Sequence, residues 1–491
     1  MKRGEGDRRG LKGTCGVLTW LLLSACGPAT PAETRSPDSS VPPGARPVPA
    51  EQTPPGEQPA PEEPTLPEPT GRSWYVSTKG SDAGAGTQES PLRTLGRAVA
   101  LAQPGEVIRV LPGVYAEQLL LESRGEGAQA IILRGEGTPR PTLVPSDRAR
   151  SSVILVRGRW ILENLHVDVG GAPMMAVTFE SGATGSFLAG SELNGGTSGA
   201  GVLVEGPAHV TIQDNHLHHF IKSGDDSHGV AVVGPSRDIV IRRNDIHHTS
   251  GDSIQCEGEV PAVALRIEGN QLHDEGENGV DLKRCQDVLV RGNQLWGFPN
   301  TAIREPGSSA GEAVVIHESA RGVVIEGNTL SRAGRGVSVL SGEDIRVEGN
   351  TLREIRNFPE GNGQGIRIAG GRNVQVVDNT VEGSASYGLM LAADGEAVTG
   401  LTVRNNRLCT GTQPLLLRLG SESFRPGLRM DTNHYAPGGV LKADGVRETL
   451  TGALTAFQAD FSGEQLLLSS QERLEVWQRV LGVDEDSSLL E

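Results

Sequence analysis

The chain has 491 residues, a formal net charge of −16 and a pI near 5.3. This net charge argues against a nucleic-acid partner and against direct binding to an anionic membrane, because both would repel an acidic protein. Glycine is frequent, with 66 residues, whereas aromatic residues make up only 3% of the chain. Such a composition favours a fold with many tight turns and a narrow aliphatic core over one large globular core.

Residues 1–25 have the pattern of a bacterial export signal, in which basic residues precede the apolar run "GVLTWLLLSAC". The run is too short to span a bilayer as a helix. Its last four residues, "LSAC", resemble a lipobox, which implies cleavage before Cys26 and lipidation of Cys26. An ordinary secretory signal is the alternative. With Gly27 in the next position, we expect a lipid-anchored protein of the bacterial outer membrane or cell surface, held to the membrane only by its lipid.

Residues 26–72 consist almost entirely of Pro, Glu, Thr, Ser and Ala. Such a segment buries too little apolar surface to fold, and its prolines keep it extended. We interpret it as a disordered tether. The folded body is then expected to begin at Ser73, with a β-helix over residues 73–430 and a C-terminal tail and cap over residues 431–491.

A short unit recurs from residue 150 to about residue 430. Each unit has an aliphatic or β-branched strand, two small or polar residues, an asparagine and a further aliphatic residue, and the asparagines are Asn215, Asn244, Asn270, Asn293, Asn328, Asn350, Asn379 and Asn406. Alternating apolar residues mark a second short strand in each unit, such as "GVLVEG" and "GVAVVG". Strands at this spacing predict an all-β, right-handed parallel β-helix of about 11–12 coils. The asparagines should then stack as an internal amide ladder.

The opening segment "WYVSTKGSDAGAGTQESPLRTLGRAVALAQPGEVIRVLPGVYAE" (74–117) resembles the start of pectate-lyase-like β-helix proteins, including the ninth polysaccharide lyase family. Within it, "PLRTLGRAVALA" is amphipathic and predicts a short N-terminal helix that caps the first coil. The tail is similar to the closing segment of the same group and ends on Trp477, Gly482 and Asp484. The resemblance implies a fold more directly than a chemistry.

Stacking the second strands predicts two outward columns of side chains. The first is Thr178, Leu203, Ala231, Gln255, Asp281, Val315 and Ser338, and the second is Glu180, Glu205, Val233, Glu257, Lys283, His317 and Leu340. A further set precedes these strands: His228, Asp252, Asn278 and Glu312. The ionisable residues therefore gather on the coils between residues 225 and 317. The cysteines of the body, Cys256, Cys285 and Cys409, show no metal-ligand spacing, and we interpret them as buried free thiols.

The resemblance implies a polysaccharide lyase that acts on an acidic polymer with Ca²⁺. Carried over, the calcium ligands are Asp252, Glu277, Asn278 and Asp281, and we add Glu257. Glu277 and Asn278 replace an aspartate pair, and Val315 stands where the family has its basic residue. Lys283 would therefore be the base, at a lowered pKa, with Arg284 or Arg304 on the substrate carboxylate. The residues expected to bind the sugar are His228, Gln255, His317 and Trp296.

Two other interpretations remain open. A glycoside hydrolase needs two separated carboxylates, and "GDDSHG" (224–229) compresses the required residue types into one coil. A non-catalytic glycan-binding or structural envelope lipoprotein needs no catalytic set, and its charged column would be a solvated ladder of ion pairs. The histidines that follow the asparagines could suggest a zinc cluster, but this turn often carries histidine in β-helices, so we favour a structural role for them: His216, His218, His219, His247, His248 and His273. We expect a monomer.

Overall fold

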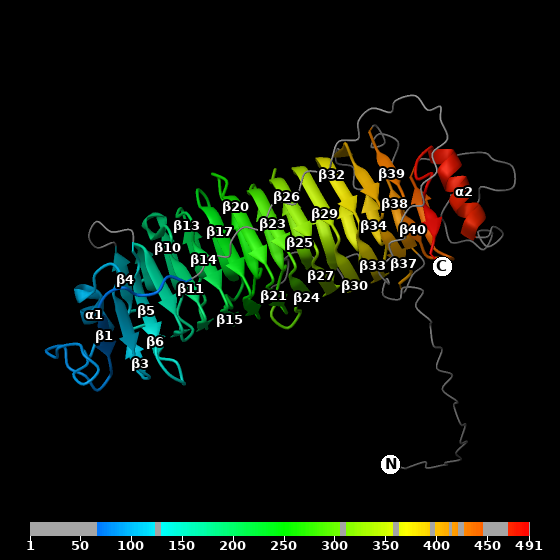
Figure 1. The fold of residues 1–491 in the computed structure, drawn as a ribbon. Coiled ribbons are helices and arrows are strands. Elements are labelled where there is room, and N and C mark those ends of the chain that lie inside the picture. The colour runs from blue at the N-terminus through cyan, green and yellow to red at the C-terminus, as the bar shows by residue number, and fades with distance from the viewer. Residues whose placement is uncertain are drawn as a thin grey trace, which may run out of the picture. The chain divides into compact units, whose positions relative to one another are not determined.

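The computed structural model describes residues 66–122, 129–304, 311–356, 363–392, 398–411, 415–420, 427–444 and 470–490. The predicted signal peptide, Cys26 and residues 26–65 of the predicted tether lie outside these ranges. Within the ranges, no helix is both long and apolar enough to cross a membrane. Short strands follow one another in chain order along a stack that begins beside α1 (Leu95–Leu101) and ends beside α2 (Ser470–Leu481) (Figure 1).

Three parallel sheets run along this stack. In the described part of the chain, sheet A has 15 strands: β1 (Ser73–Val76), β2 (Val107–Val110), β5 (Ile131–Gly135), β8 (Trp160–Glu163), β11 (Phe187–Ala189), β14 (Thr211–Gln213), β17 (Arg237–Arg242), β20 (Val263–Glu268), β23 (Gln286–Arg291), β26 (Arg321–Glu326), β29 (Glu343–Glu348), β32 (Gly371–Val377), β35 (Val398–Thr399), β36 (Thr402–Arg404) and β39 (Arg429–Asp431). Sheet B likewise has 14 described strands: β3 (Val114–Ala116), β6 (Thr142–Val144), β9 (His166–Asp168), β12 (Glu192–Asn194), β15 (His216–His218), β18 (Asp245–His247), β21 (Gln271–His273), β24 (Gln294–Phe298), β27 (Thr329–Ala333), β30 (Thr351–Ile355), β33 (Thr380–Ser384), β37 (Arg407–Cys409), β40 (His434–Tyr435) and β42 (Ser488–Leu489). Sheet C has 13 described strands: β4 (Leu119–Glu122), β7 (Ser152–Arg157), β10 (Met175–Glu180), β13 (Ala200–Glu205), β16 (His228–Val233), β19 (Ile254–Glu257), β22 (Val280–Lys283), β25 (Glu312–His317), β28 (Arg335–Val339), β31 (Ile366–Ile368), β34 (Leu389–Leu391), β38 (Leu415–Leu419) and β41 (Val440–Ala443). A short 3-10 helix, η1 (Ser181–Ala183), follows β10.

The core lies between the three sheets and is built from one side of each strand. In β20, Leu265 and Ile267 are buried, whereas Arg266 between them is partly exposed, because successive side chains point to opposite faces. The register places Ile241, Ile267 and Val290 above one another in successive coils. The chain thus forms a parallel β-solenoid of about 11 turns, which confirms the predicted fold class.

The predicted amide ladder is present. Asn270 Nδ2 donates to Asn293 Oδ1 at 2.9 Å, and Asn293 Nδ2 donates to Asn328 Oδ1 at 3.0 Å. The same bond joins all the predicted members, and the residues immediately before them have a positive φ. Glycine, asparagine and aspartate adopt this left-handed conformation most readily, which explains most of the small or polar residues before each asparagine in the repeat.

The ladder continues one coil further than predicted and ends on Asp484. Asn406 Nδ2 donates to Asn433 Oδ1, and Asn433 Nδ2 donates to Asp484 Oδ1, both at 3.0 Å. The other oxygen of Asp484 accepts from Tyr435 Oη at 2.6 Å and from Trp477 Nε1 at 3.1 Å. Asp484 therefore supplies the acceptors that a further coil would otherwise provide, and α2 with its following turn closes this end of the stack.

The opposite end is covered by the predicted helix. Leu95, Ala98 and Val99 of α1 are buried, and the helix packs against β1, β2 and β4. The Thr94 side chain caps its first turn by accepting from the backbone N–H of Arg97 at 3.2 Å. The helix thus shields the edge of the first coil, as the amphipathic pattern predicts.

Cys256 and Cys285 form a disulfide between successive coils, with their Cα atoms 6.3 Å apart. The prediction of free thiols is therefore wrong for both residues. Their separation of 29 residues is about one coil, so stacking brings them together although the sequence contains no closely spaced cysteine pair. Cys409 is buried.

Candidate functional site

The predicted columns of side chains lie on sheet C in the expected register. Gln255, Asp281 and Val315 are aligned in β19, β22 and β25, and Lys283 is aligned with His317 in the next column. Parallel pairing keeps equivalent residues of successive coils in line, so the period of the repeat is enough to predict these neighbours. The ionisable residues of these two columns are thus brought together on one sheet.

Asp281 is the centre of this cluster, which we call the Asp281 cluster (Asp281, Lys283, His317 and Glu257). Its side chain is 6% exposed, and its Oδ1 lies 2.7 Å from His317 Nε2. Its Oδ2 lies 3.1 Å from Lys283 Nζ, which is also 3.8 Å from Glu257 Oε2. The side chains of Lys283 and His317 are each 23% exposed and that of Glu257 is 47% exposed. One buried carboxylate therefore holds an ammonium and an imidazole at the surface of sheet C.

The pKa of Lys283 is raised, whereas its predicted role as a base requires a lowered pKa. Burial lowers the pKa of Lys283, but the carboxylates of Asp281, Asp252 and Glu257 outweigh burial and raise it above its usual value. Lys283 is consequently an ammonium at neutral pH. It can pair with an anion, but it cannot accept a proton from a substrate.

The residues at the start of these strands or just before it form a second, buried polar ladder beside the cluster. Asn278 donates from both its backbone N–H, at 3.1 Å, and its Nδ2, at 2.9 Å, to Asp252 Oδ1. Asp252 Oδ2 lies 3.2 Å from His228 Nδ1. The Glu312 N–H donates to Asn278 Oδ1 at 2.9 Å, and the Glu312 carboxylate pairs with Arg335 at 2.6 Å. Burial raises the pKa of Asp252 against the opposing effect of His228.

These contacts do not fit a calcium shell. The oxygens of Asp252 and Asp281 face hydrogen-bond donors and cations, whereas Ca²⁺ needs six to eight oxygens directed at it. Glu257 faces Lys283, and Glu277 lies close enough to His228 to raise its pKa. Among the described residues, the groups of His, Asp and Glu whose ligand atoms all lie within 4.8 Å are Glu192–His216–His218 and His216–Asp245–His247, and neither contains a predicted calcium ligand.

Three other predicted residues are not members of the Asp281 cluster. Trp296 is on β24 of sheet B, where its ring stacks on His273 with centroids 4.3 Å apart, so it is no sugar platform for sheet C. Arg284 follows β22 in a left-handed conformation, with a φ of 59°, and pairs with Glu318 at 2.7 Å. Arg304 lies on the turn after β24. Of the other residues predicted to bind sugar, His317 belongs to the cluster, whereas His228 and Gln255 are at the sheet C strands but buried.

Glu275 lies between β21 and β22 and is completely buried. Its carboxylate accepts from the Thr249 N–H at 2.5 Å and from Ser253 Oγ at 2.8 Å, which ties two coils together. Burial raises its pKa to about 8. The sequence carries no signal of this burial, because Glu275 stands in an acidic run that looks solvated.

The comparisons with known proteins concern the fold. The family described as "Right handed beta helix region" matches residues 200–310 and 300–408. The chain contains a right-handed β-helix. This match confirms the predicted handedness of the coil. A family described as "Protein of unknown function (DUF1565)" matches residues 78–122, within the opening segment and the coil that follows it.

The relatives of the β-helix differ in what they do. Uncharacterized protein YwoF of Bacillus subtilis (strain 168) is 25% identical over 169 residues. The match covers 33% of this chain and 32% of YwoF, so the chain spans about a third of that relative's length. The PL6 family alginate lyase AlyGC is 16% identical with a TM-score of 0.55, over 70% of this chain and 50% of that one. PfbA, a surface adhesin of Streptococcus pneumoniae, is 12% identical with a TM-score of 0.50, over 66% of this chain and 84% of PfbA. The two structural matches show a shared fold alone, and the ninth-family resemblance stays a prediction.

Proposed function

We propose that this chain is an exported β-helix protein that binds an acidic polysaccharide across sheet C and cleaves it by elimination at the Asp281 cluster. The observation that carries the proposal is that Lys283 and His317 lie side by side, partly exposed, around one buried carboxylate. A uronic-acid chain presents a carboxylate next to a weakly acidic C–H bond. Its cleavage therefore needs a cation beside a base.

In this proposal Lys283 is the cation and His317 is the base. The Asp281 carboxylate only accepts hydrogen bonds, so the His317 Nε2 proton is directed at Asp281 and the lone pair is on Nδ1. Nδ1 takes the proton beside the uronate carboxylate, the bond to the leaving sugar oxygen breaks, a carbon–carbon double bond forms, and the leaving oxygen takes a proton from water. The Lys283 ammonium stabilises the negative charge that develops on the carboxylate.

A second candidate function is glycan binding without cleavage. It is favoured by the internal pairing of the cluster, because both oxygens of Asp281 and the ammonium of Lys283 already have partners within the protein. Such a surface can hold a polymer through hydrogen bonds at Glu257 and His317 without reacting with it.

The proposed location is the bacterial envelope, with a lipid on Cys26. The Cys256–Cys285 disulfide supports export, because disulfides persist in oxidising compartments and are rare in the cytosol. Incorporation of a labelled fatty acid into the full chain, and its loss in Cys26→Ala, is the expected result. A chain that is exported but carries no label would leave export intact and refute the anchor.

The decisive experiment incubates the full chain with alginate, pectate and a glycosaminoglycan and follows the absorbance of the new conjugated double bond. Under the proposal one polymer gives a signal that is lost in His317→Ala and strongly reduced in Lys283→Ala. Lys442→Ala is the matched control, because Lys442 lies on β41 of the same sheet and pairs with Asp444 at 3.7 Å, far along the chain from the cluster. Retention of a polymer in affinity electrophoresis without any product would favour binding alone. If the chain neither retains nor cleaves any of these polymers, both functions are refuted.

A further inference from the structure

The outer face of sheet B carries a group of histidines on consecutive coils. Parallel pairing aligns Glu192 with His216 and His216 with Asp245 in one column, and it aligns His218 with His247 in the neighbouring column. His216 and His218 stand two residues apart on β15, so their side chains lie on the same face of the strand. Their ring centroids are 4.3 Å apart.

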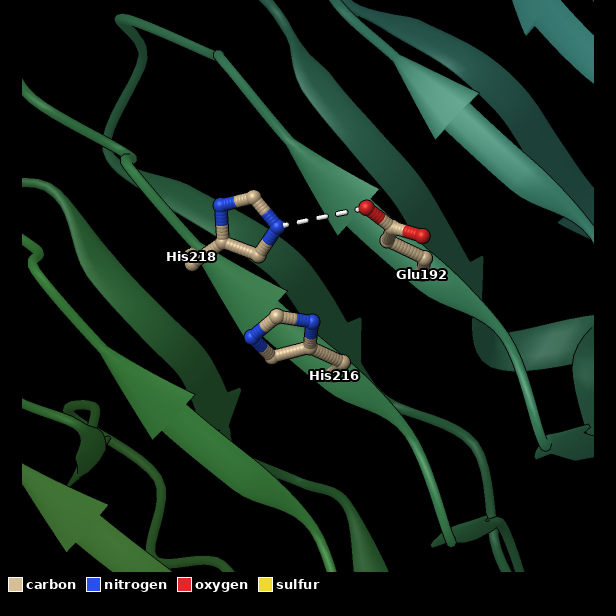
Figure 2. A group of neighbouring side chains, drawn as sticks. All are labelled: Glu192, His216 and His218. Carbon is tan, nitrogen blue, oxygen red and sulfur yellow. Dashed lines mark ion pairs between the residues drawn. The ribbon is translucent and has the colours of Figure 1, made fainter.

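We propose that Glu192, His216 and His218 bind a divalent transition-metal ion of the Zn²⁺ class. Each residue offers one ligand atom, and these atoms all lie within 4.8 Å of one another. Figure 2 shows the two imidazoles on one strand and the carboxylate on the preceding coil, with the His218 ring directed at Glu192. The site is independent of the Asp281 cluster, which is on sheet C.

The contact between His218 and Glu192 has the dimensions of a metal site rather than of a hydrogen bond. His218 Nε2 is buried and has no hydrogen-bond partner in the described part of the chain. It lies 3.6 Å from Glu192 Oε1. A tetrahedral Zn²⁺ with ligands at about 2.0–2.2 Å separates two ligand atoms by roughly 3.3–3.5 Å, so a small adjustment admits the ion.

The donor set selects the metal. Two imidazole nitrogens and one carboxylate oxygen suit Zn²⁺ and related transition metals, whereas Ca²⁺ and Mg²⁺ prefer oxygen ligands alone. Three protein ligands leave a fourth coordination position open.

Contacts around the three residues resemble a supporting shell. His218 Nδ1 lies 2.7 Å from His219 Nδ1, which orients the ring so that Nε2 points toward Glu192. The second oxygen of Glu192 lies 3.5 Å from Arg140 Nη1. His216 and Arg140 also line a cavity of about 290 Å³, which offers space next to the site.

The group His216–Asp245–His247 competes for the same ion, because it shares His216. His216 Nε2 lies 2.8 Å from His247 Nε2, the distance of a hydrogen bond between two imidazoles. That contact uses Nε2 of both His216 and His247, whereas His218 Nε2 has no hydrogen-bond partner among the described residues. This difference favours the group that contains Glu192.

The test is Zn²⁺ titration of the full chain by calorimetry, with metal content measured after dialysis. One Zn²⁺ per chain is expected, with no saturable binding of Mg²⁺ at this site. His218→Ala and Glu192→Gln should each weaken Zn²⁺ binding by about 100-fold or more, since even loss of a supporting residue costs 10–100-fold. His209→Ala is the matched control, because His209 is 58% exposed and pairs with Asp238 away from this group.

Without metal, the variants must first show the same unfolding midpoint as the wild-type chain. Glu192→Gln keeps the shape of the side chain, so a folding defect in His218→Ala alone would not leave the proposal untested. Absence of bound Zn²⁺ would overturn the proposal. Loss of binding in Asp245→Asn and His247→Ala, with His218→Ala and Glu192→Gln unaffected, would also overturn it and assign the ion to the neighbouring group. Equal weakening by His209→Ala would show nonspecific histidine binding and refute the site.

Discussion

Asp281 Oδ1 lies 2.7 Å from His317 Nε2, although the two residues are 36 positions apart in the chain. Asp281 is buried, so its charge depends on His317 and Lys283 for compensation. Substituting Asp281 by Asn should therefore destabilise the protein by about 1–3 kcal/mol, because two basic groups lose their anion in a partly desolvated site. Chemical unfolding measures this change.

Asp238→Asn is the control and should shift stability by less than about 1 kcal/mol, since the Asp238 side chain is 42% exposed. Equal effects of the two variants would show that burial of Asp281 contributes nothing.

Glu275 should make stability fall as pH rises. Its pKa is about 8 in the folded protein and near 4.5 in the unfolded chain, so the folded state holds more protons between these values. Its contribution is fully present below the unfolded pKa and is lost as pH rises toward 8. Glu275→Gln, which cannot ionise, should flatten the dependence of the unfolding free energy on pH in this window. An unchanged slope in the variant would contradict the raised pKa.

Asn293 lies in the middle of the amide ladder and is 1% exposed. Asn293→Ala removes an acceptor used by Asn270 and a donor used by Asn328, and leaves buried polar groups without partners. The expected cost is about 2–4 kcal/mol, since one unsatisfied buried polar group costs about 1–3 kcal/mol. Thr329→Ala, at an exposed position on the next coil, should have little effect. A cost for Asn293→Ala no larger than that for Thr329→Ala would mean that the ladder does not stabilise the stack.

The Cys256–Cys285 disulfide should stabilise the protein by about 2–4 kcal/mol, because it constrains the unfolded chain. A reductant is expected to lower the melting temperature of the wild-type chain. The double variant Cys256→Ser and Cys285→Ser should start from that lower value and change less on reduction. If reduction leaves the wild-type melting temperature unchanged, the disulfide is either absent or without effect on stability.

Calcium should not stabilise the region around Asp252. Its oxygens accept from Asn278 and face His228, so a calcium ion would have to displace contacts that already compensate the carboxylate. We expect the same unfolding midpoint with Ca²⁺ and with a chelator. A saturable stabilisation by Ca²⁺ that Asp252→Asn removes would restore the calcium site that the family resemblance implies.

Much of the fold was accessible from the sequence because a solenoid converts a period along the chain into contacts in space. The spacing of residues such as Asn270 and Asn293 was enough to predict their hydrogen bond, and the columns containing Asp281 and Lys283 were predicted in the correct register. In each case the neighbour is the equivalent residue of the adjacent coil. No contact between distant parts of the chain had to be guessed.

The properties of the sites depended on the tertiary structure. The pKa of Lys283 is set by the balance between its burial and three carboxylates from neighbouring strands, and residue order alone predicted the opposite direction. Trp296, which is close to the charged residues in sequence, is on another sheet because each coil turns between sheets. His218 is placed against Glu192 only by pairing of β12 with β15. The repeat thus determined which residues stack, whereas burial and the packing of neighbouring coils determined their charge, partners and chemistry.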